Sequence, residues 1–292
     1  MNNLVNQFDT CLVCGSSSIG SLNSYEANYL VKCADCKFVF SQRKPTQSEL
    51  TDHYKLYFRG NAISPITIKR YNELLDKFEK YRKINNIMDV GCGDGYFLSE
   101  AKKRNWNVFG VEFSEEAIQV CASKGIQMTQ SPLDINNYQP SDFDIITSFE
   151  VLEHINNPRE ELKAFNALLR KGGIVYATTP NFNSVSRNIL GTKWNVIQYP
   201  EHLCYYTKRT ISRLFNDHLF EVFELKTTGL SLTRLTTSLG AESSGGKTQS
   251  MDESLRQMSE KKMLFQVIKK TVNYLLNIFR KGDSIQAIFL KS

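Results

Sequence analysis

The chain has 292 residues, of which 41% are hydrophobic and 23% are charged, and its formal net charge is +6. This composition is ordinary for a globular protein and excludes wholesale disorder. The charge is modest for the length, so it does not by itself indicate nucleic-acid binding, which shows a concentrated basic face. No basic segment followed by an apolar core opens the chain, and no apolar run approaches the roughly 18 residues that span a bilayer, so we expect a soluble, cytoplasmic protein.

The first zone holds two CxxC pairs, "CLVCG" and "CADCK", spaced C-x2-C-x18-C-x2-C. This spacing is typical of a zinc site with four thiolate ligands, Cys11, Cys14, Cys33 and Cys36. Four thiolates leave no coordination position open, so we expect a structural Zn²⁺. A redox pair is the alternative, but one CxxC would suffice for it and no thioredoxin-like pattern surrounds either. We therefore expect a zinc ribbon over residues 1–44, then a helical connector over residues 45–85, and we expect Cys92, Cys121 and Cys204 to be structural.

In residues 86–230, short apolar runs alternate with amphipathic stretches. The predicted strands are "NIMDV", "NVFGVEF", "FDIITSF", "GIVYATT" and "FEVFELK". The predicted helices are Tyr96–Arg104, Glu115–Ser123 with Ser114 as N-cap, and Pro158–Arg170 with Asn157 as N-cap and a Gly172-Gly173 stop. This alternation predicts an α/β fold with a doubly wound, mostly parallel sheet.

The turn after the first of these strands is "DVGCGDG", with glycines at 91, 93 and 95. In a parallel sheet this turn lines the ligand crevice, and glycine lets a ligand approach without meeting a Cβ atom. The spacing differs from the dinucleotide fingerprint GxGxxG. A carboxylate at Asp89 suits a ligand with an ammonium group, and Glu112, at the end of the second strand, can accept hydrogen bonds from two ribose hydroxyls. S-adenosylmethionine has both features.

These residues also carry a family resemblance. "DVGCGDG", "GVEFS", "FDIITSFEVLEHI", "LLRKGGIVYATTPN" and "HLF" before "EVFEL" resemble, in order, the motifs of class I S-adenosylmethionine-dependent methyltransferases. The resemblance covers about residues 86–230 and implies a Rossmann-like, seven-stranded sheet. It further implies that Asp89, Gly91 and Gly93 bind the methionine moiety and Glu112 the ribose. It places Cys92 and Phe113 in the same site, Ser131, Pro132 and Leu133 beside the adenine, and Phe149 beside the sulfonium, although many relatives carry an acidic residue where this chain has Pro132.

Methyl transfer to oxygen needs positioning and a base, and histidine is the usual base near neutral pH. The resemblance places His154, in "EVLEHI", opposite the methyl group. His202, in "NVIQYPEHLCYYT", follows the fifth strand at the expected substrate wall, with Tyr199, Glu201, Tyr205 and Tyr206. A structural role for either histidine stays open. His53 is left unassigned, and for His218 we expect a position at a helix end.

The third zone, residues 231–292, begins with the flexible stretch "GAESSGGKTQS" and ends with the predicted strand "SIQAIFLK". Between them Leu264, Ile268, Val272, Leu275 and Phe279 recur at helical spacing and predict an apolar face. Six basic residues and no acidic ones lie between positions 261 and 281. Two interpretations are open: the face packs on the sheet edge or over the active site, or residues 251–281 contact an anionic membrane surface, which would place the protein at the inner membrane face.

A cysteine ribbon before such a core resembles two groups: bacterial methyltransferases associated with sugars and polysaccharides, and ribosomal RNA guanine methyltransferases. The pattern "VKCADCKFVFSQRKPTQSELTDHY" is more similar to the first, although the long C-terminal domain of sugar C-methyltransferases has no counterpart in this sequence. We therefore expect O-methylation of a sugar, a glycan or another small hydroxylated acceptor, including nucleotide- or lipid-linked forms, in a pathway such as polysaccharide biosynthesis. The alternatives are an RNA methyltransferase that binds RNA through the ribbon and a non-catalytic subunit that keeps the fold.

Overall fold

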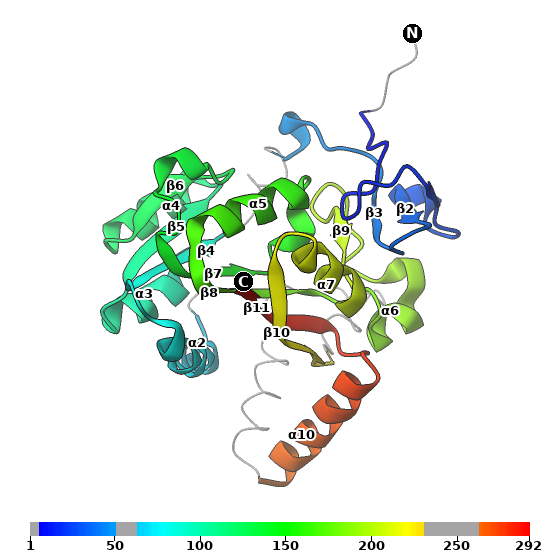
Figure 1. Cartoon of the computed structure of the whole chain (residues 1–292). Helices are drawn as coiled ribbons and strands as arrows, with labels where there is room; N and C mark the ends of the chain where they lie inside the picture. The colour runs from blue at the N-terminus through cyan, green and yellow to red at the C-terminus, as the bar shows by residue number, and fades with distance from the viewer. Residues whose placement is uncertain (1–5, 51–62, 231–262) are drawn as a thin grey trace.

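A twisted seven-stranded sheet forms the centre of the computed structural model, which describes residues 6–50, 63–230 and 263–292. The strand order is β10-β11-β8-β7-β4-β5-β6 (Figure 1), and β11 alone among these strands runs antiparallel to its neighbours. The strands are β4 (Asn86–Val90), β5 (Asn107–Glu112), β6 (Gln127–Gln130), β7 (Phe143–Phe149), β8 (Leu169–Pro180), β10 (Phe220–Thr228) and β11 (Ser284–Lys291). The order reverses between β4 and β7, which confirms the predicted Rossmann-like α/β fold and fixes where a ligand crevice should open.

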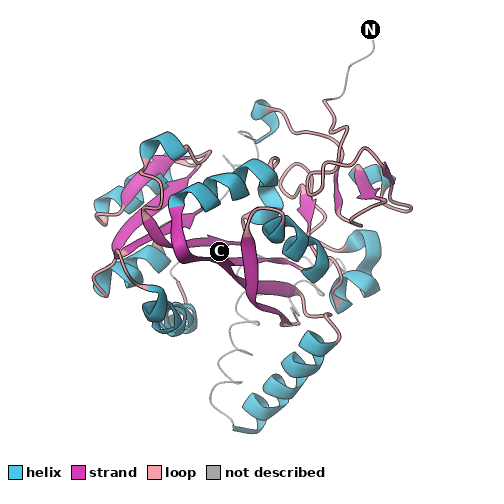
Figure 2. Ribbon diagram, viewed as in Figure 1, coloured by secondary structure: helices cyan, strands magenta, loops and turns pink. Residues whose placement is uncertain are grey.

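Helices cover both faces of this sheet (Figure 2). The helices around it are α2 (Pro65–Phe78), α3 (Tyr96–Lys103), α4 (Glu115–Ser123), α5 (Pro158–Leu168), α6 (Val185–Leu190), α7 (Lys208–Asn216) and α10 (Met263–Ile278). Successive strand residues point to opposite faces: Met88 packs with α5 and α7, whereas Ile87 packs with α2 and α3. The central strands are therefore apolar at consecutive positions, as expected for a parallel sheet buried on both sides.

The predicted strands and helices of the core are present with boundaries close to the expected ones except at the junction of α5 and β8, whereas β6, α6 and β9 (Cys204–Tyr205) were not predicted. The predicted helix Pro158–Arg170 ends at Leu168, and β8 begins at Leu169 instead of after the glycine pair. Leu169 pairs with Phe143, so the strand runs through the glycine pair. Glycine is required at position 173, because a Cβ atom there would lie 2.9 Å from the carbonyl oxygen of Asp144. Strand β6, with the sequence QMTQ, has no hydrophobic pattern that would reveal it.

The N-terminal zone forms a second, antiparallel sheet of four strands in the order β1-β2-β3-β9. These strands are β1 (Ile19–Ser21), β2 (Leu30–Cys33), β3 (Val39–Ser41) and β9 (Cys204–Tyr205). Strand β9 comes from the central zone of the sequence, and the buried Phe38 and Phe40 share one hydrophobic core with Met88 of β4. Figure 1 shows the blue N-terminal strands beside β9. The cysteine module is therefore packed against the core of the larger sheet.

The helical stretch predicted after Pro45 appears as one turn over residues 47–50, then as α2 and a short 3-10 turn, η2 (Glu79–Tyr81). Residues 51–62, which include His53, lie outside the described residues, as does the stretch 231–262. Ser64 begins α2 as an N-cap, because its hydroxyl oxygen accepts a hydrogen bond from the amide of Ile66.

Helix α10 precedes β11 and packs along β10. Its buried side chain is Leu276, whose carbonyl oxygen accepts a hydrogen bond from the Thr227 hydroxyl. Val272, Leu275 and Phe279 of the predicted apolar face are exposed, with Phe279 at 67%. Side chains of Leu264 and Ile268 lie outside the described part. In the described turns of α10, therefore, the predicted apolar face does not pack on the sheet, which was one of its two interpretations. None of the helices that the structure describes has the length and apolar character needed to cross a bilayer.

Candidate active site

A cleft of about 760 Å³ opens at the carboxyl ends of β4, β5 and β7. This volume is within the range of about 300–1,000 Å³ typical of small-molecule sites. Its walls come from the glycine turn, the ends of β5 and β7, the loop after β6, the first turns of α5, and residues Gln47 and Leu50 of the connector. The position is the one expected for a ligand at the reversal point of a doubly wound sheet.

The glycines of the turn serve different purposes. Gly91 has φ +72°, and a Cβ atom there would lie 2.4 Å from Cγ2 of Val151, so the loop after β7 packs directly on it. Gly93 has φ +52° with nothing within 4 Å of its ideal Cβ position, and it lines the cleft. The first glycine thus permits close packing between two loops, whereas the second keeps open the space where a ligand can approach the backbone.

Asp89 ends β4 beneath the turn and is 2% exposed. Its Oδ1 atom accepts a hydrogen bond of 2.7 Å from the Thr147 hydroxyl. Burial raises the pKa of Asp89 to about 8, and the nearby Glu112 carboxylate acts in the same direction, while the Thr147 hydrogen bond lowers it. A cationic group bound above Asp89 would favour its ionised form, so this carboxyl is suited to a ligand that carries positive charge.

Glu112 ties the end of β5 to the glycine turn. Its Oε2 accepts a hydrogen bond of 2.9 Å from the Gly93 amide, and its Oε1 accepts bonds from the amides of Phe113 and Ser114 at 2.8 and 3.1 Å. The carboxylate is 7% exposed and lines the cleft. These three amides hold the carboxylate in one orientation at the edge of the cleft.

The structure brings most of the predicted cofactor residues to this cleft. Its lining includes Gly91, Gly93, Glu112, Phe113, Ser131, Pro132, Leu133 and Phe149. Asp89 and Cys92 lie beneath the turn, where the Cys92 sulfur is 4.0 Å from that of Cys121. Phe149 packs edge-to-face against Phe97, with ring centroids 5.0 Å apart.

The two candidate histidines, 48 positions apart in the sequence, lie against each other. Their ring centroids are 4.6 Å apart at an interplanar angle of 66°. His154 belongs to the 3-10 turn η4 (Leu152–His154) and lines the cleft. The loop that carries His202 is joined to η4 by a hydrogen bond of 2.8 Å from the Leu203 amide to the Glu153 carbonyl oxygen. The sequence offered the two histidines as separate candidates, whereas the structure makes them a pair.

The residues predicted to accompany His202 take mainly structural positions. Tyr206 is buried with its ring centroid 5.1 Å from that of Phe38, and the Tyr205 hydroxyl donates to the carbonyl oxygen of His202. Tyr199 donates from its hydroxyl to Glu49 of the connector at 3.3 Å, and Glu201 is buried. His218 follows α7, and its Nδ1 atom lies 2.7 Å from the carbonyl oxygen of Leu214, the helix-end position that we expected.

Several cleft residues have no sequence signal. Glu161 of α5 lines the cleft, and burial raises the pKa of its carboxyl to about 7. Helix α5 packs against η3 (Ile135–Asn137), just beyond the loop that holds Pro132. Glu150 also lines the cleft with a φ of +53°, and its amide donates to the carbonyl oxygen of Thr178. In the sequence, Glu161 is an ordinary acid of an amphipathic helix and Glu150 an ordinary acid after a strand. Only the three-dimensional structure shows that both line the cleft.

The four N-terminal cysteines converge as their spacing predicts. Their sulfurs all lie within 4.8 Å of one another, with Cys11 and Cys36 at 3.4 Å and Cys14 and Cys33 at 3.6 Å. A tetrahedral zinc site with bonds of about 2.3 Å has sulfur–sulfur edges of about 3.8 Å. The described cysteines form no disulfide, so the four thiols fit a closed, structural Zn²⁺ site, and none of the four lines the cleft.

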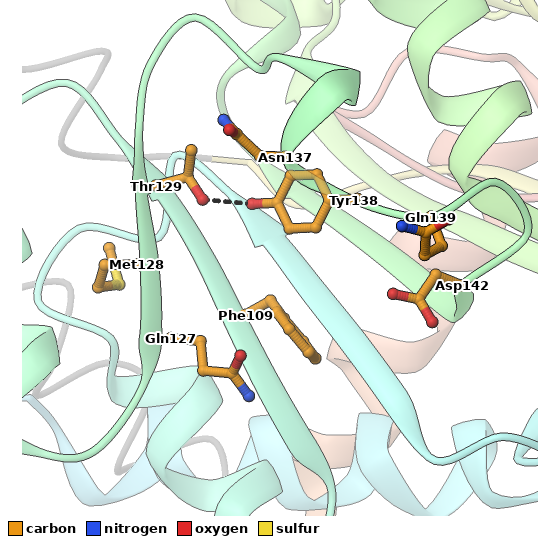
Figure 3. A pocket seen from close by; sticks show the side chains of 8 residues that line it. All are labelled: Phe109, Gln127, Met128, Thr129, Asn137, Tyr138, Gln139 and Asp142. Carbon is orange, nitrogen blue, oxygen red and sulfur yellow. Dashed lines mark hydrogen bonds between the residues drawn. The ribbon is translucent and has the colours of Figure 1, made fainter.

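A second hollow, of about 250 Å³, lies beside β5 and β6 (Figure 3). Within it the Tyr138 hydroxyl points to the Thr129 hydroxyl, 2.5 Å away, and Phe109 forms the floor beside them. The hollow is smaller than the usual small-molecule site of about 300 Å³ or more and shares no residue with the cleft. It therefore carries no functional assignment.

Residues 63–225, more than half of the chain, match the family described as a methyltransferase domain. The chain belongs to this family. The methyltransferase domain is 27% identical over 133 residues to a ubiquinone biosynthesis O-methyltransferase of Bordetella avium, and 31% identical over 146 residues to one of Coxiella burnetii. These alignments cover 43% and 46% of this chain and 54% and 58% of the relatives, so the chain spans about half the length of the curated relatives it matches.

Solved structures show the same fold. An S-adenosylmethionine-dependent methyltransferase from Archaeoglobus fulgidus has a TM-score of 0.53 at 18% identity, over 84% of this chain and 100% of that one. Phosphoethanolamine N-methyltransferase 2 of Haemonchus contortus, in complex with S-adenosyl-L-methionine, has a TM-score of 0.51 at 18% identity, over 84% of this chain and 57% of that one. At this identity the likeness shows the fold, and the family is the methyltransferase domain family that residues 63–225 match.

Proposed function

We propose that the protein transfers a methyl group from S-adenosylmethionine to an oxygen of a small hydroxylated acceptor. The observation that carries the proposal is the continuity of one cleft from the glycine turn and Glu112 to His154. A cofactor held at the first end would present its sulfonium to an acceptor at the second end, where His154 and His202 lie in contact. The O-methyltransferase names of the curated relatives support oxygen as the attacking atom.

Within this proposal the cofactor residues have separate roles. Asp89 neutralises the charge of the ammonium group of the methionine moiety. The backbone of Gly91 and Gly93 lies beside the same moiety. Glu112 accepts hydrogen bonds from the ribose hydroxyls, and Ser131, Pro132 and Leu133 border the adenine. Phe149 lies beside the sulfonium, where an aromatic ring can attract positive charge. Phe113 contributes to the lining, and Cys92 packs beneath the turn.

The reaction is an in-line displacement. The acceptor oxygen forms a bond to the methyl carbon as the carbon–sulfur bond breaks, and S-adenosylhomocysteine leaves with the bonding electron pair. In the simplest form, the hydroxyl proton passes to Nε2 of His154 or His202. Positioning supplies most of the acceleration, since the sulfonium already activates the carbon, and proton transfer contributes about 10²–10⁴-fold.

We infer that the acceptor is a sugar, a glycan or a related small molecule, and not a nucleic acid. The similarity of the cysteine ribbon to the sugar-associated methyltransferases supports this, as does the position of the connector, which places Gln47 and Leu50 on the cleft wall. A ribbon packed into the core in this way serves to build the acceptor site. We infer further that the cysteines hold Zn²⁺, which would join the N-terminal sheet into one rigid unit.

We also propose that α10 contacts an anionic membrane surface at the cytoplasmic face, which would suit a lipid-linked acceptor. Val272, Leu275 and Phe279 are exposed on it, and the exposed Lys270 and Arg280 flank them. Apolar side chains bordered by basic ones favour such surfaces. In liposome sedimentation, a Leu275→Ser, Phe279→Ser double variant should bind anionic vesicles less than the wild type, whereas Ile189→Ser, at an exposed position elsewhere, should not. Equal binding to anionic and neutral vesicles would remove this proposal.

The function is tested first by calorimetric titration with S-adenosylmethionine, alongside Asp89→Ala. Binding by the wild type and its loss in the variant support the cofactor site and justify a screen of hydroxylated acceptors that begins with nucleotide sugars. Methyl transfer is then followed as S-adenosylhomocysteine formation. A folded, metal-replete wild type that binds no cofactor would contradict the proposal.

A further inference from the structure

We propose that Glu153, His154 and His202 form a second metal site, which holds a divalent transition-metal ion at the edge of the cofactor cleft. One ligand atom from each of the three residues lies within 4.8 Å of the other two. His154 also lines the cleft, so an ion held here would be within reach of a bound acceptor. The catalytic meaning of this site rests on the proposed function, whereas ion binding itself does not.

Both imidazoles are held in the tautomer that binds metal through Nε2. The Nδ1 atom of His154 lies 2.9 Å from the carbonyl oxygen of Glu201, and that of His202 lies 2.6 Å from the carbonyl oxygen of Val196. A carbonyl oxygen only accepts, so each Nδ1 carries the proton and donates it. Nε2 then bears the lone pair. Histidine ligands of metals are usually oriented in this way, by donation to a carbonyl or a carboxylate.

Glu153 forms the closed side of the group. Its side chain is buried, and its Oε2 atom accepts a hydrogen bond of 2.8 Å from the Thr179 hydroxyl. A cation shared with the two imidazoles would add to the interactions that stabilise this buried carboxylate. Thr179, on β8, would orient the carboxylate toward the ion. The backbone bond from Leu203 to Glu153 holds the two contributing segments together.

The donor set indicates the class of ion. Two imidazoles and one carboxylate suit zinc and other first-row divalent ions, whereas magnesium and calcium prefer oxygen ligands alone. Three protein ligands leave a coordination position open, as in catalytic zinc sites. The four thiolates of the cysteine cluster leave none, so the two sites should differ in both chemistry and purpose.

An ion here would change how the acceptor is activated. By binding the acceptor hydroxyl it would lower the pKa of that group, and the proton would pass to solvent water in place of a histidine. The O–C bond would then form as the C–S bond breaks, with S-adenosylhomocysteine as the leaving group. His154 and His202 would thus be ligands, and the methylation rate would depend on the metal supplied.

The test counts metal in the full-length protein. Zn²⁺ bound per chain is measured by mass spectrometry and by calorimetric titration, with two equivalents expected for the wild type and one for Glu153→Gln and for His202→Gln. His218→Gln is the matched control and should keep both, because its Nδ1 likewise contacts a carbonyl oxygen but it lies outside the group. Thr179→Val should weaken the second equivalent about 10- to 100-fold.

Substitution with Co²⁺ assigns each equivalent, because thiolate ligands give sulfur-to-metal charge-transfer absorption that nitrogen and oxygen ligands lack. The variants should keep the thiolate bands and the affinity for S-adenosylmethionine, which shows that they are folded. The inference is overturned if the wild type binds metal at the thiolate site alone. It is also overturned if Glu153→Gln and His202→Gln both still bind two equivalents. A wild type that keeps two equivalents but transfers no methyl group would overturn the proposed function and leave the metal site standing.

Discussion

The two halves of the cleft are built in different ways. The cofactor half is local: a single stretch from Asp89 to Phe113, which runs through β4, the glycine turn, α3 and β5, supplies most of its polar contacts. The half that we propose for the acceptor combines residues 47–50 with the loop after β7, which is far away in the sequence, and His202 from the loop before β9 contacts its His154. It is held together by the β3–β9 pairing and by the Leu203–Glu153 backbone hydrogen bond.

This difference predicts which substitutions should affect cofactor affinity and which should affect turnover or stability. A change in the local half should alter cofactor affinity and leave the packing of the N-terminal sheet intact. A change in the assembled half should alter turnover or stability and leave cofactor affinity nearly constant. The following variants test that separation, from the largest expected effect to the smallest.

Replacing His154 with Gln should reduce kcat about 10²–10⁴-fold with the acceptor found by screening, because the group that activates the hydroxyl is removed. The dissociation constant for S-adenosylmethionine should change less than threefold, about 0.6 kcal/mol. Initial-rate kinetics and calorimetry measure the two quantities, with His218→Gln as control. Full turnover in both His154→Gln and His202→Gln would remove the pair from the mechanism.

Replacing Phe38 with Ala should lower the free energy of unfolding by about 3–5 kcal/mol, because its ring is buried between the N-terminal sheet and the core. Chemical denaturation followed by fluorescence measures it. The exposed Tyr29→Ala is a control for loss of an aromatic ring, with a smaller expected change. If Phe38→Ala unfolds only the N-terminal sheet while the core melts as in the wild type, the two sheets are separate units and the acceptor half is not assembled as described.

Replacing Asp89 with Asn should stabilise the cofactor-free protein at pH 8 while it abolishes tight cofactor binding. The pKa of Asp89 is raised to about 8 in the fold, above about 3.9 in the unfolded chain, so ionisation makes this group increasingly destabilising as the pH rises from about 4 to 8. Asn does not titrate and can still accept the Thr147 hydrogen bond. We expect a gain of up to about 5 kcal/mol at pH 8 that shrinks toward pH 5, as measured by denaturation.

A constant difference between the Asp89→Asn and wild-type stabilities over this pH range would show that Asp89 is not destabilised by ionisation. Glu116→Gln, an exposed acid on α4, serves as control and should show no such trend. Because we propose that the same residue binds the ammonium group, we expect stability and cofactor affinity to move in opposite directions in this variant.

Replacing Gly93 with Ala should weaken cofactor binding about tenfold, or about 1.4 kcal/mol, and should lower stability only by the roughly 1–2 kcal/mol that an alanine costs at a φ of +52°. The new Cβ atom meets open space in the free protein but enters the volume that the ligand needs. Gly95→Ala is the contrasting variant, since its Cβ atom would lie 2.6 Å from Ile126 and 2.7 Å from the Cys121 sulfur, and it should lower stability. Equal affinity in Gly93→Ala and the wild type would place the ligand elsewhere.

Much of the fold follows from patterns that need no tertiary information. The apolar runs of β4, β5, β7 and β11 predict strands because both sheet faces are buried, and Ser114 marks the start of α4 because its hydroxyl caps the helix. The polar β6 and the early start of β8 escape such patterns. Strand β6 forms by pairing with β5, and the first residue of β8 pairs with β7. No local run of residues encodes either pairing.

The sequence by itself predicted which residues would meet at the half of the cleft that we propose for the cofactor, because the glycines, Asp89 and Glu112 are neighbours along one βα unit whose geometry is standard. It also determined the cysteine cluster, since two short loops suffice to place four sulfurs. Only the tertiary structure paired His154 with His202, brought Glu153 to them and set the connector on the cleft wall. These contacts join distant segments through β9 and the shared core, and chain spacing carries no record of such long-range packing.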